Sequence, residues 1–464
     1  MINGIVFVAM VALMSWGGGG ATVTGLLFVV VFAAAISLVV GFVYRRDHVP
    51  ACTAIFVLIA AYFPRAWQAL EKGFAFPIKA SGEAVAWALL ALIVFMAIAV
   101  SVAHLVAPRL TVPAAIIEYV ATGGRPAIGA ISIGLLVLVS TIAGFRTGMW
   151  SHYGDLVKID PGGIRMELLY FPLLFGFSVA IGRMALKELI GTEIDLKRAI
   201  PTSLIWTLTI VLLFIAQSRR AMLGALILTL VSAWLETTRV SLLRTVFVTA
   251  GLAVLAIGLA VGSYLWRHAG PATDALEQLK VISDRSVDIE DFSQNFSDRL
   301  TYLWIDSSSI EHYQILQSDA DLYDVANSNI IRATPEIILP DKYATKRVVC
   351  ENAFEVMGIR TDLPCTPTAE GIIYGGIPGL FITATFYGIG LGIITALYRR
   401  NTFASLALGG TAMYQHVLIE CSAFPIIDSM RVLVISIFVA GTVAWVLRFF
   451  DVMWTAKKNE TRSG

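Results

Sequence analysis

Paired arginines interrupt one of the apolar stretches of the chain. Ser218-Arg219-Arg220 lies inside the run from Pro201 to Leu235. Two short helices with the arginines at their outer tip explain this pattern better than one long helix, because an arginine inside the membrane costs at least ~2.5 kcal/mol. A guanidinium is a fixed fork of N–H donors that binds phosphate oxygens bidentately. Arg219 and Arg220 are therefore candidates for binding a lipid-linked diphosphate; the alternative is that they anchor helix ends among lipid headgroups.

A further arginine opens a helical pattern at Ser297 to Gln317, inside a long polar segment that begins at Arg267. Arg299 and Tyr302 are three residues apart and therefore share one face of a helix. A cation beside an aromatic ring is suited to binding a sugar phosphate. Ordinary amphipathic helices also contain such pairs, and this second interpretation stays open.

Glu370 and His312 are candidates for the base that removes the proton from a sugar hydroxyl. Glu370 stands where the polar segment gives way to an apolar run. Partial burial, or a nearby cation, would tune a carboxylate there for proton transfer. The alternative is a helix N-terminal acid that is stabilised by the helix dipole. His312 would act through its neutral imidazole, unless it is a solvated surface residue.

Other polar residues stand at predicted outer helix ends and form a second tier of candidates. Asp428 and Arg431 are spaced for an ion pair, and Arg146 extends the basic surface from another outer loop. Cys350 and Cys365 lie close together in the polar segment. A disulfide between them would suit an oxidising compartment, whereas two separate thiols are the alternative.

Metal and nucleotide chemistry find no support in the motifs of the chain. The sequence contains no CxxC, HExxH or GxxxxGK[ST] pattern, and its 6 histidines are scattered. These patterns mark metal sites and nucleotide-hydrolysing loops, so we expect neither a metal nor another cofactor. No basic tract indicates nucleic acid as a partner.

The elements that position the candidate residues are membrane-spanning helices. The chain is 57% hydrophobic and 14% charged, against roughly 45–50% and 25% in soluble domains. Its apolar runs are long enough to cross a ~30 Å hydrocarbon layer as helices, and a spanning backbone must satisfy its own hydrogen bonds. The sequence therefore predicts an all-α polytopic membrane protein with about twelve spans. They fall at approximately 3–16, 21–44, 50–64, 83–107, 127–145, 167–186, 201–217, 221–235, 245–266, 372–398, 403–418 and 430–450.

Positive residues in the short connections predict the orientation of the chain. An excess of lysine and arginine marks the cytoplasmic side, which places both termini inside. The predicted organisation comprises spans one to nine, one large outer loop or lid between the ninth and tenth spans, spans ten to twelve, and a cytoplasmic tail. These parts occupy residues 1–266, 267–371, 372–450 and 451–464.

Three motifs together resemble those of the bacterial O-antigen polymerase and O-antigen ligase superfamily of membrane glycosyltransferases. The first is the turn Gln217-Ser218-Arg219-Arg220-Ala221-Met222-Leu223-Gly224, and the second is Ser297-Asp298-Arg299-Leu300-Thr301-Tyr302-Leu303-Trp304. The third is the acidic, glycine-broken entry to a span, Glu370-Gly371-Ile372-Ile373-Tyr374-Gly375-Gly376-Ile377-Pro378-Gly379-Leu380. Their order and spacing carry the resemblance, because each motif alone is weak.

The resemblance implies a helical fold of the GT-C type in a bacterial inner membrane, with the large loop in the periplasm. It implies a glycosyltransferase that joins undecaprenyl-diphosphate-linked repeat units into O-antigen, capsule or exopolysaccharide, without metal. Arg219 or Arg220, with Arg299, would hold the diphosphate as a leaving group, while Glu370 and His312 compete as base. A lipid-linked donor and acceptor, membrane lipids and a chain-length regulator or export protein are the partners to expect.

The alternatives are a ligase, a transporter, a peptidoglycan polymerase of the shape-and-division family, which usually has fewer spans and whose signatures find no match, and a structural membrane scaffold. The ligase branch usually shows a His-Asn pair before the span that follows the large loop. Thr366-Pro367-Thr368 stands there instead, which favours polymerase over ligase. A flippase or secondary transporter for lipid-linked glycans also suits twelve spans. Transporters place broken helices near the bilayer midplane and show paired halves, and neither feature is clear in the sequence.

Overall fold

The computed structural model describes most of the second half of the chain and three stretches of the first. The described residues are 80–146, 166–191, 196–215, 302–316, 321–334, 338–341, 366–418 and 425–463, with Phe354 and scattered residues between 225 and 258. Of the residues that can be interpreted, 92% are helical, which confirms the predicted all-helical architecture.

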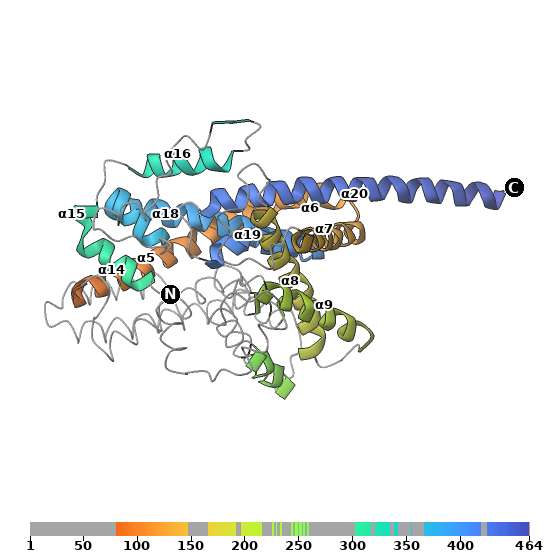
Figure 1. The fold of residues 1–464 in the computed structure, drawn as a ribbon, viewed down its shortest axis with the longest axis horizontal. Helices are drawn as coiled ribbons and strands as arrows, with labels where there is room; N and C mark the ends of the chain where they lie inside the picture. The colour runs from red at the N-terminus through yellow and green to blue at the C-terminus, as the bar shows by residue number, and fades with distance from the viewer. Residues whose placement is uncertain are drawn as a thin grey trace. The chain divides into compact units, whose positions relative to one another are not determined.

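The helices of the described residues are shown in Figure 1. In chain order they are α5 (Gly82–Val106), the short 3₁₀ helix η2 (Ala107–Leu110), α6 (Thr111–Thr122), α7 (Pro126–Arg146), α8 (Met166–Ile190), α9 (Leu196–Ile215), α14 (Tyr302–Glu311), α15 (Tyr313–Leu316), α16 (Leu322–Ala333), α18 (Pro367–Arg399), α19 (Phe403–Leu418) and α20 (Pro425–Ser463).

Within the described residues, three helical stretches are long and apolar enough to cross a membrane. They are Gly82–Thr122, Pro367–Arg399 and Met430–Met453. These stretches contain the spans predicted at 83–107, 372–398 and 430–450. The chain therefore has the character of a helical membrane protein, while the count of twelve spans and the GT-C arrangement stay predictions.

Helix α6 was not expected from the sequence, which predicts a cytoplasmic connection between Arg109 and Arg125. The structure forms a 12-residue helix there, which follows α5 through η2 and ends at Gly123 with a left-handed φ of 57°. It extends the helical stretch that begins with α5, Gly82–Thr122, beyond the predicted end of the span at 107. A connection predicted as a loop is therefore largely helical.

The chain divides into two compact units. The first unit comprises residues 1–104, 249–391 and 415–428, and the second comprises 105–248, 392–414 and 429–464. In the first unit α5 packs on α18, where the rings of Phe95 and Tyr387 lie 5.3 Å apart. Helix α14 adds Trp304, whose ring stacks on that of Phe354 at 6.2 Å.

The second unit is built on a close crossing of helices α8 and α19. A Cβ added at Gly176 would lie 2.1 Å from the carbonyl oxygen of Ala407, so only glycine permits this approach. Small residues at such crossings let helix backbones come together where no hydrophobic effect between helices is available. Helix α20 is held to the turn after α6 by a hydrogen bond of 2.7 Å from Arg448 Nη1 to the carbonyl oxygen of Gly123.

Candidate functional site

The first unit contains a helix that is broken near its start. In α18, Gly376 adopts φ 59° and ψ −145°, and Pro378 follows two residues later. Residues with a side chain rarely adopt this backbone conformation, so glycine is required at the break. The part of α18 after the break, 377–399, forms roughly 35 Å of helix, which is enough to cross a bilayer without the part before it.

The part of α18 before the break packs against helices of the predicted outer loop. A Cβ added at Gly375 would lie 2.6 Å from Cδ1 of Leu322, the first residue of α16. A Cβ added at Gly376 would lie 3.3 Å from the hydroxyl of Tyr313, the first residue of α15. Helices α15 and α16 therefore lie directly against the break, and Figure 1 shows both of them near α18.

Thr366 connects the start of α18 to helix α14. Its hydroxyl donates a hydrogen bond to Oδ1 of Asp306. The hydroxyl oxygen of Thr366 also accepts a hydrogen bond of 2.9 Å from the backbone N–H of Ala369, which is the usual bond of a helix N-cap. One side chain thus begins the helix and fixes its position against the loop.

Two carboxyl groups are fully buried beside this connection. Asp306 and Glu370 are both 0% exposed. Glu370 lies one helical turn after Thr366, since its backbone N–H donates to the carbonyl oxygen of Thr366 at 3.0 Å. Burial of a carboxylate is costly unless polar groups surround it. The three residues after Asp306, Ser307, Ser308 and Ser309, are also buried, and the hydroxyls of Ser307 and Ser309 donate to carbonyl oxygens of their own helix. Polar side chains are thus buried where α14 meets the start of α18.

His312 lies at the turn between α14 and α15. It is partly exposed, and its backbone N–H donates to the carbonyl oxygen of Ser308 at 3.0 Å. Among the described groups its Nε2 atom has no hydrogen-bond partner. The preceding residue, Glu311, accepts a hydrogen bond of 2.5 Å from the hydroxyl of Ser81 and so joins α14 to the start of α5.

For four other predicted site residues the structure gives mainly the helix to which each belongs. Tyr302 begins α14, Arg146 ends α7, and Asp428 and Arg431 both belong to α20, where Arg431 is partly buried. The remaining predicted residues lie outside the described part of the chain: Arg219, Arg220, Arg299, Cys350 and Cys365. The structure thus places Glu370 one helical turn after Thr366, which bonds to Asp306, a residue that the sequence did not single out.

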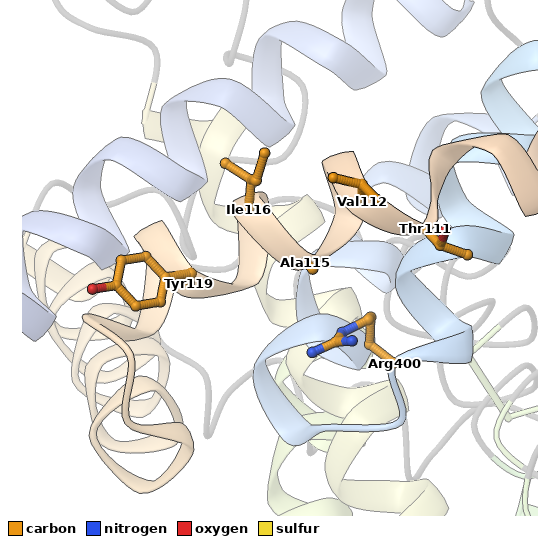
Figure 2. Close-up of a pocket in the computed structure, with 6 residues that line it drawn as sticks. All are labelled: Thr111, Val112, Ala115, Ile116, Tyr119 and Arg400. Atoms are coloured by element: carbon orange, nitrogen blue, oxygen red, sulfur yellow. The ribbon is translucent and has the colours of Figure 1, made fainter.

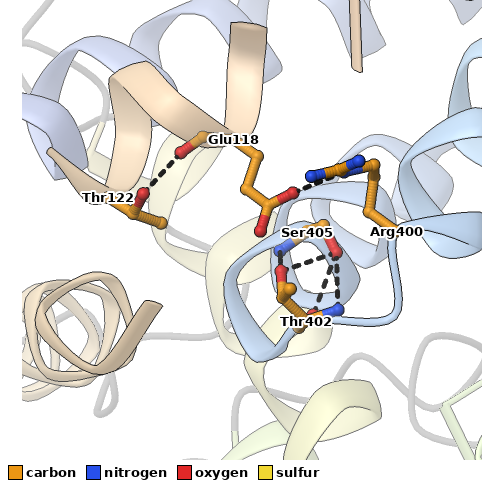
Figure 3. Close-up of polar contacts among 5 residues, drawn as sticks. All are labelled: Glu118, Thr122, Arg400, Thr402 and Ser405. Carbon is orange, nitrogen blue, oxygen red and sulfur yellow. Dashed lines mark hydrogen bonds and ion pairs between the residues drawn. The ribbon is translucent and has the colours of Figure 1, made fainter. Parts of the chain in front are cut away.

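The second unit contains a different polar site, which Figure 3 shows. Arg400 Nε donates a hydrogen bond of 2.7 Å to Oε2 of Glu118, in an ion pair with side-chain exposures of 45% and 8%. Glu118 belongs to α6, and Arg400 directly follows α18. Thr402 and Ser405 cap α19 through reciprocal side-chain to backbone bonds of 3.1 and 3.2 Å. The cap fixes the short connection that presents Arg400.

A shallow groove of about 470 Å³ runs along α6 beside this ion pair, as Figure 2 shows. Its walls are formed by one face of α6 and by Arg400. The residues that line it are Thr111, Val112, Ala115, Ile116, Tyr119 and Arg400.

Comparison of the chain with models of protein families, with curated proteins and with solved structures gives no match. The functions proposed for the two sites therefore rest on the residues of the sites themselves.

Proposed function

We propose that this chain is a membrane glycosyltransferase that polymerises undecaprenyl-diphosphate-linked repeat units on the periplasmic side of a bacterial inner membrane. The observation that carries the proposal is the fully buried Glu370 at the junction between the loop helices and the spanning part of α18. A glycan on a lipid anchor has its reactive end at this level of the membrane. The motifs around Arg219, Arg299 and Glu370 support the same function.

In the proposed reaction a hydroxyl oxygen of the acceptor glycan attacks the anomeric carbon of the donor. The bond between that carbon and the diphosphate oxygen breaks, and the diphosphate leaves with the bonding electrons. Glu370 takes the hydroxyl proton as general base, with His312 as the competing candidate. Arg219, Arg220 and Arg299 stabilise the charge on the leaving diphosphate.

Asp306 and Thr366 act as positioning residues in this proposal. Thr366 begins α18 and bonds to Asp306, so these two residues fix the turn of helix that carries Glu370. Because Glu370 is covered in the structure, the acceptor reaches it only when the loop helices α14 to α16 move away from the start of α18. The large loop then acts as the lid that the sequence suggests.

The break in α18 is the one observation that favours a flippase or transporter instead. Transporter sites are formed by broken helices near the bilayer midplane. The length of α18 after Gly376 argues against that position, because this part alone is long enough for a whole span. The break then lies at the membrane boundary, where a polymerase needs its acceptor.

Deletion of the gene, followed by gel analysis of surface glycans and lipid-linked intermediates, separates the candidates. A polymerase predicts single repeat units that accumulate on the outer side of the membrane. Repeat units trapped inside would indicate a flippase, and complete polymer retained on its lipid carrier would indicate a ligase. Either of these two results contradicts the proposal.

A further inference from the structure

Helix α6 has its apolar face turned outward. Val112, Ile116 and Tyr119 are 67%, 59% and 55% exposed, and their spacing places them along one side of the helix. The opposite side, which is buried, contains the carboxylate of Glu118. A helix surrounded by water shows the reverse arrangement, with its apolar stripe inward. The surroundings of α6 are therefore lipid.

Helix α6 continues α5 and η2 in one helical stretch, Gly82–Thr122, that is long and apolar enough to cross a membrane. Its last turn packs on α20, since a Cβ added at Gly441 would lie 2.9 Å from the carbonyl oxygen of Val120. Arg400 directly follows the candidate span Pro367–Arg399, and an arginine at the end of a span reaches the level of the headgroups.

Arg400 brings an anion-binding group to the groove. Its bond to Glu118 occupies Nε, and the structure gives the other two guanidinium nitrogens no further hydrogen bond within the described residues. Those nitrogens can form a second pair of bonds with a phosphate. Among the residues that line the groove Arg400 alone is charged.

The charge balance around the groove is positive. Glu118 offsets the charge of Arg400, but Arg109 stands two residues before the lining residue Thr111 and is exposed. A zwitterionic headgroup would gain little from this excess, whereas an anionic headgroup is attracted by it. The exposed apolar residues of α6 lie along the groove beside Arg400, in the position that an acyl chain needs when its phosphate binds Arg400.

We propose that the groove between α6 and Arg400 is a binding site for an anionic phospholipid. The phosphate binds the guanidinium of Arg400, and the first part of an acyl chain lies along Val112 and Ile116. The site is independent of Glu370 and of the polymerase proposal, and the lipid would bind where α18 ends.

The test uses the full-length protein, purified in detergent and analysed by native mass spectrometry with phosphatidylglycerol or phosphatidylcholine added. We expect the protein to retain phosphatidylglycerol in preference to phosphatidylcholine. Arg400→Gln should lower the retention of phosphatidylglycerol by about fivefold or more, the equivalent of losing roughly one favourable kcal/mol. The glutamine amide still bonds to Glu118, so the helix contact persists.

Two matched variants test the assignment from other directions. Glu118→Gln removes the competing charge and should leave retention unchanged or higher. Ile116→Asp alters the apolar wall without touching the ion pair and should lower retention. Lys187→Gln, which removes an exposed cation that does not line the groove, is the control and should have no effect.

Three results would overturn the proposal. One is equal retention of the two lipids by the unmodified protein. Another is equal retention of phosphatidylglycerol by the unmodified protein and by both Arg400→Gln and Ile116→Asp. The third is complete displacement of phosphatidylglycerol by millimolar inorganic phosphate, which would show a site for the free anion rather than for a lipid.

Discussion

Two helices of 12 residues, α6 and α16, differ in how they begin and in what they expose. Helix α16 exposes Asp324 and Asn327 beside Tyr323 and Ile330, and it begins with a complete capping box between Asp321 and Asp324. Helix α6 exposes Val112, Ile116 and Tyr119 and has no side-chain cap at its start. Capping by carboxylates suits water, while an exposed face without charged residues suits lipid. We therefore expect water around the start of α16 and lipid around α6.

The two regions also differ in how they hold a buried carboxylate. Glu118 is paired with a guanidinium that is itself half-exposed. Asp306 accepts a hydrogen bond from the hydroxyl of Thr366, and Glu370 lies one helical turn after Thr366. Glu118 therefore has a cationic partner, whereas Asp306 has a neutral one.

The largest expected effect separates the two buried carboxylates by function. Glu370→Gln should lower polymer formation in cells at least about 100-fold, because general bases contribute 10²–10⁴-fold to rates. Glu118→Gln keeps the shape of the side chain and should leave polymer formation within about threefold of normal. Gel analysis of surface glycans, with immunoblots of the membrane fraction to compare protein amounts, measures both. Equal losses in the two variants would remove the functional distinction between the regions.

A second prediction concerns the surroundings of the two helices. Tyr323→Cys in α16 should react with a membrane-impermeant thiol reagent added to intact spheroplasts, because the side chain is 73% exposed and the proposal puts this loop in the periplasm. Ile116→Cys in α6 should react at least about tenfold more slowly, because thiolate formation and reagent access both require water. The unmodified protein gives the background from its own 4 cysteines. Comparable labelling of both positions would contradict the assignment of water to one helix and lipid to the other.

The smallest effect concerns the stability of the ion pair and should be asymmetric. Arg400→Leu leaves Glu118 buried and unpaired and should cost about 1–3 kcal/mol of unfolding free energy. Glu118→Leu leaves a half-exposed arginine that water can solvate, so it should cost less than about 1 kcal/mol. The double variant should resemble Glu118→Leu. Unfolding of the purified protein in detergent measures the three changes, and equal losses in the single variants would show that Glu118 is less buried than the structure indicates.

Periodic features of the sequence predict the structure well, because they depend only on neighbouring residues. The helix at 403–418 has the bounds that its apolar run indicates. The glycines and proline after Glu370 mark the broken entry to α18, although the sequence does not show which glycine adopts the unusual conformation.

Contacts between distant residues could not be predicted in this way. Thr366 and Asp306 are 60 positions apart, and Arg400 and Glu118 are 282 positions apart. Nothing local distinguishes Asp306 from a surface acid, or Arg400 from the other cations in the predicted short connections. Each gains its role from the helix that packs against it.

The central claim is that this chain itself extends glycans on a lipid carrier, and a reconstituted reaction tests it most directly. The purified protein in liposomes is supplied with an undecaprenyl-diphosphate-linked repeat unit, in the presence of EDTA and without nucleotide. We predict products that are longer by whole repeat units, together with release of undecaprenyl diphosphate. Unextended substrate, recovered from the opposite leaflet or unchanged, would contradict the account.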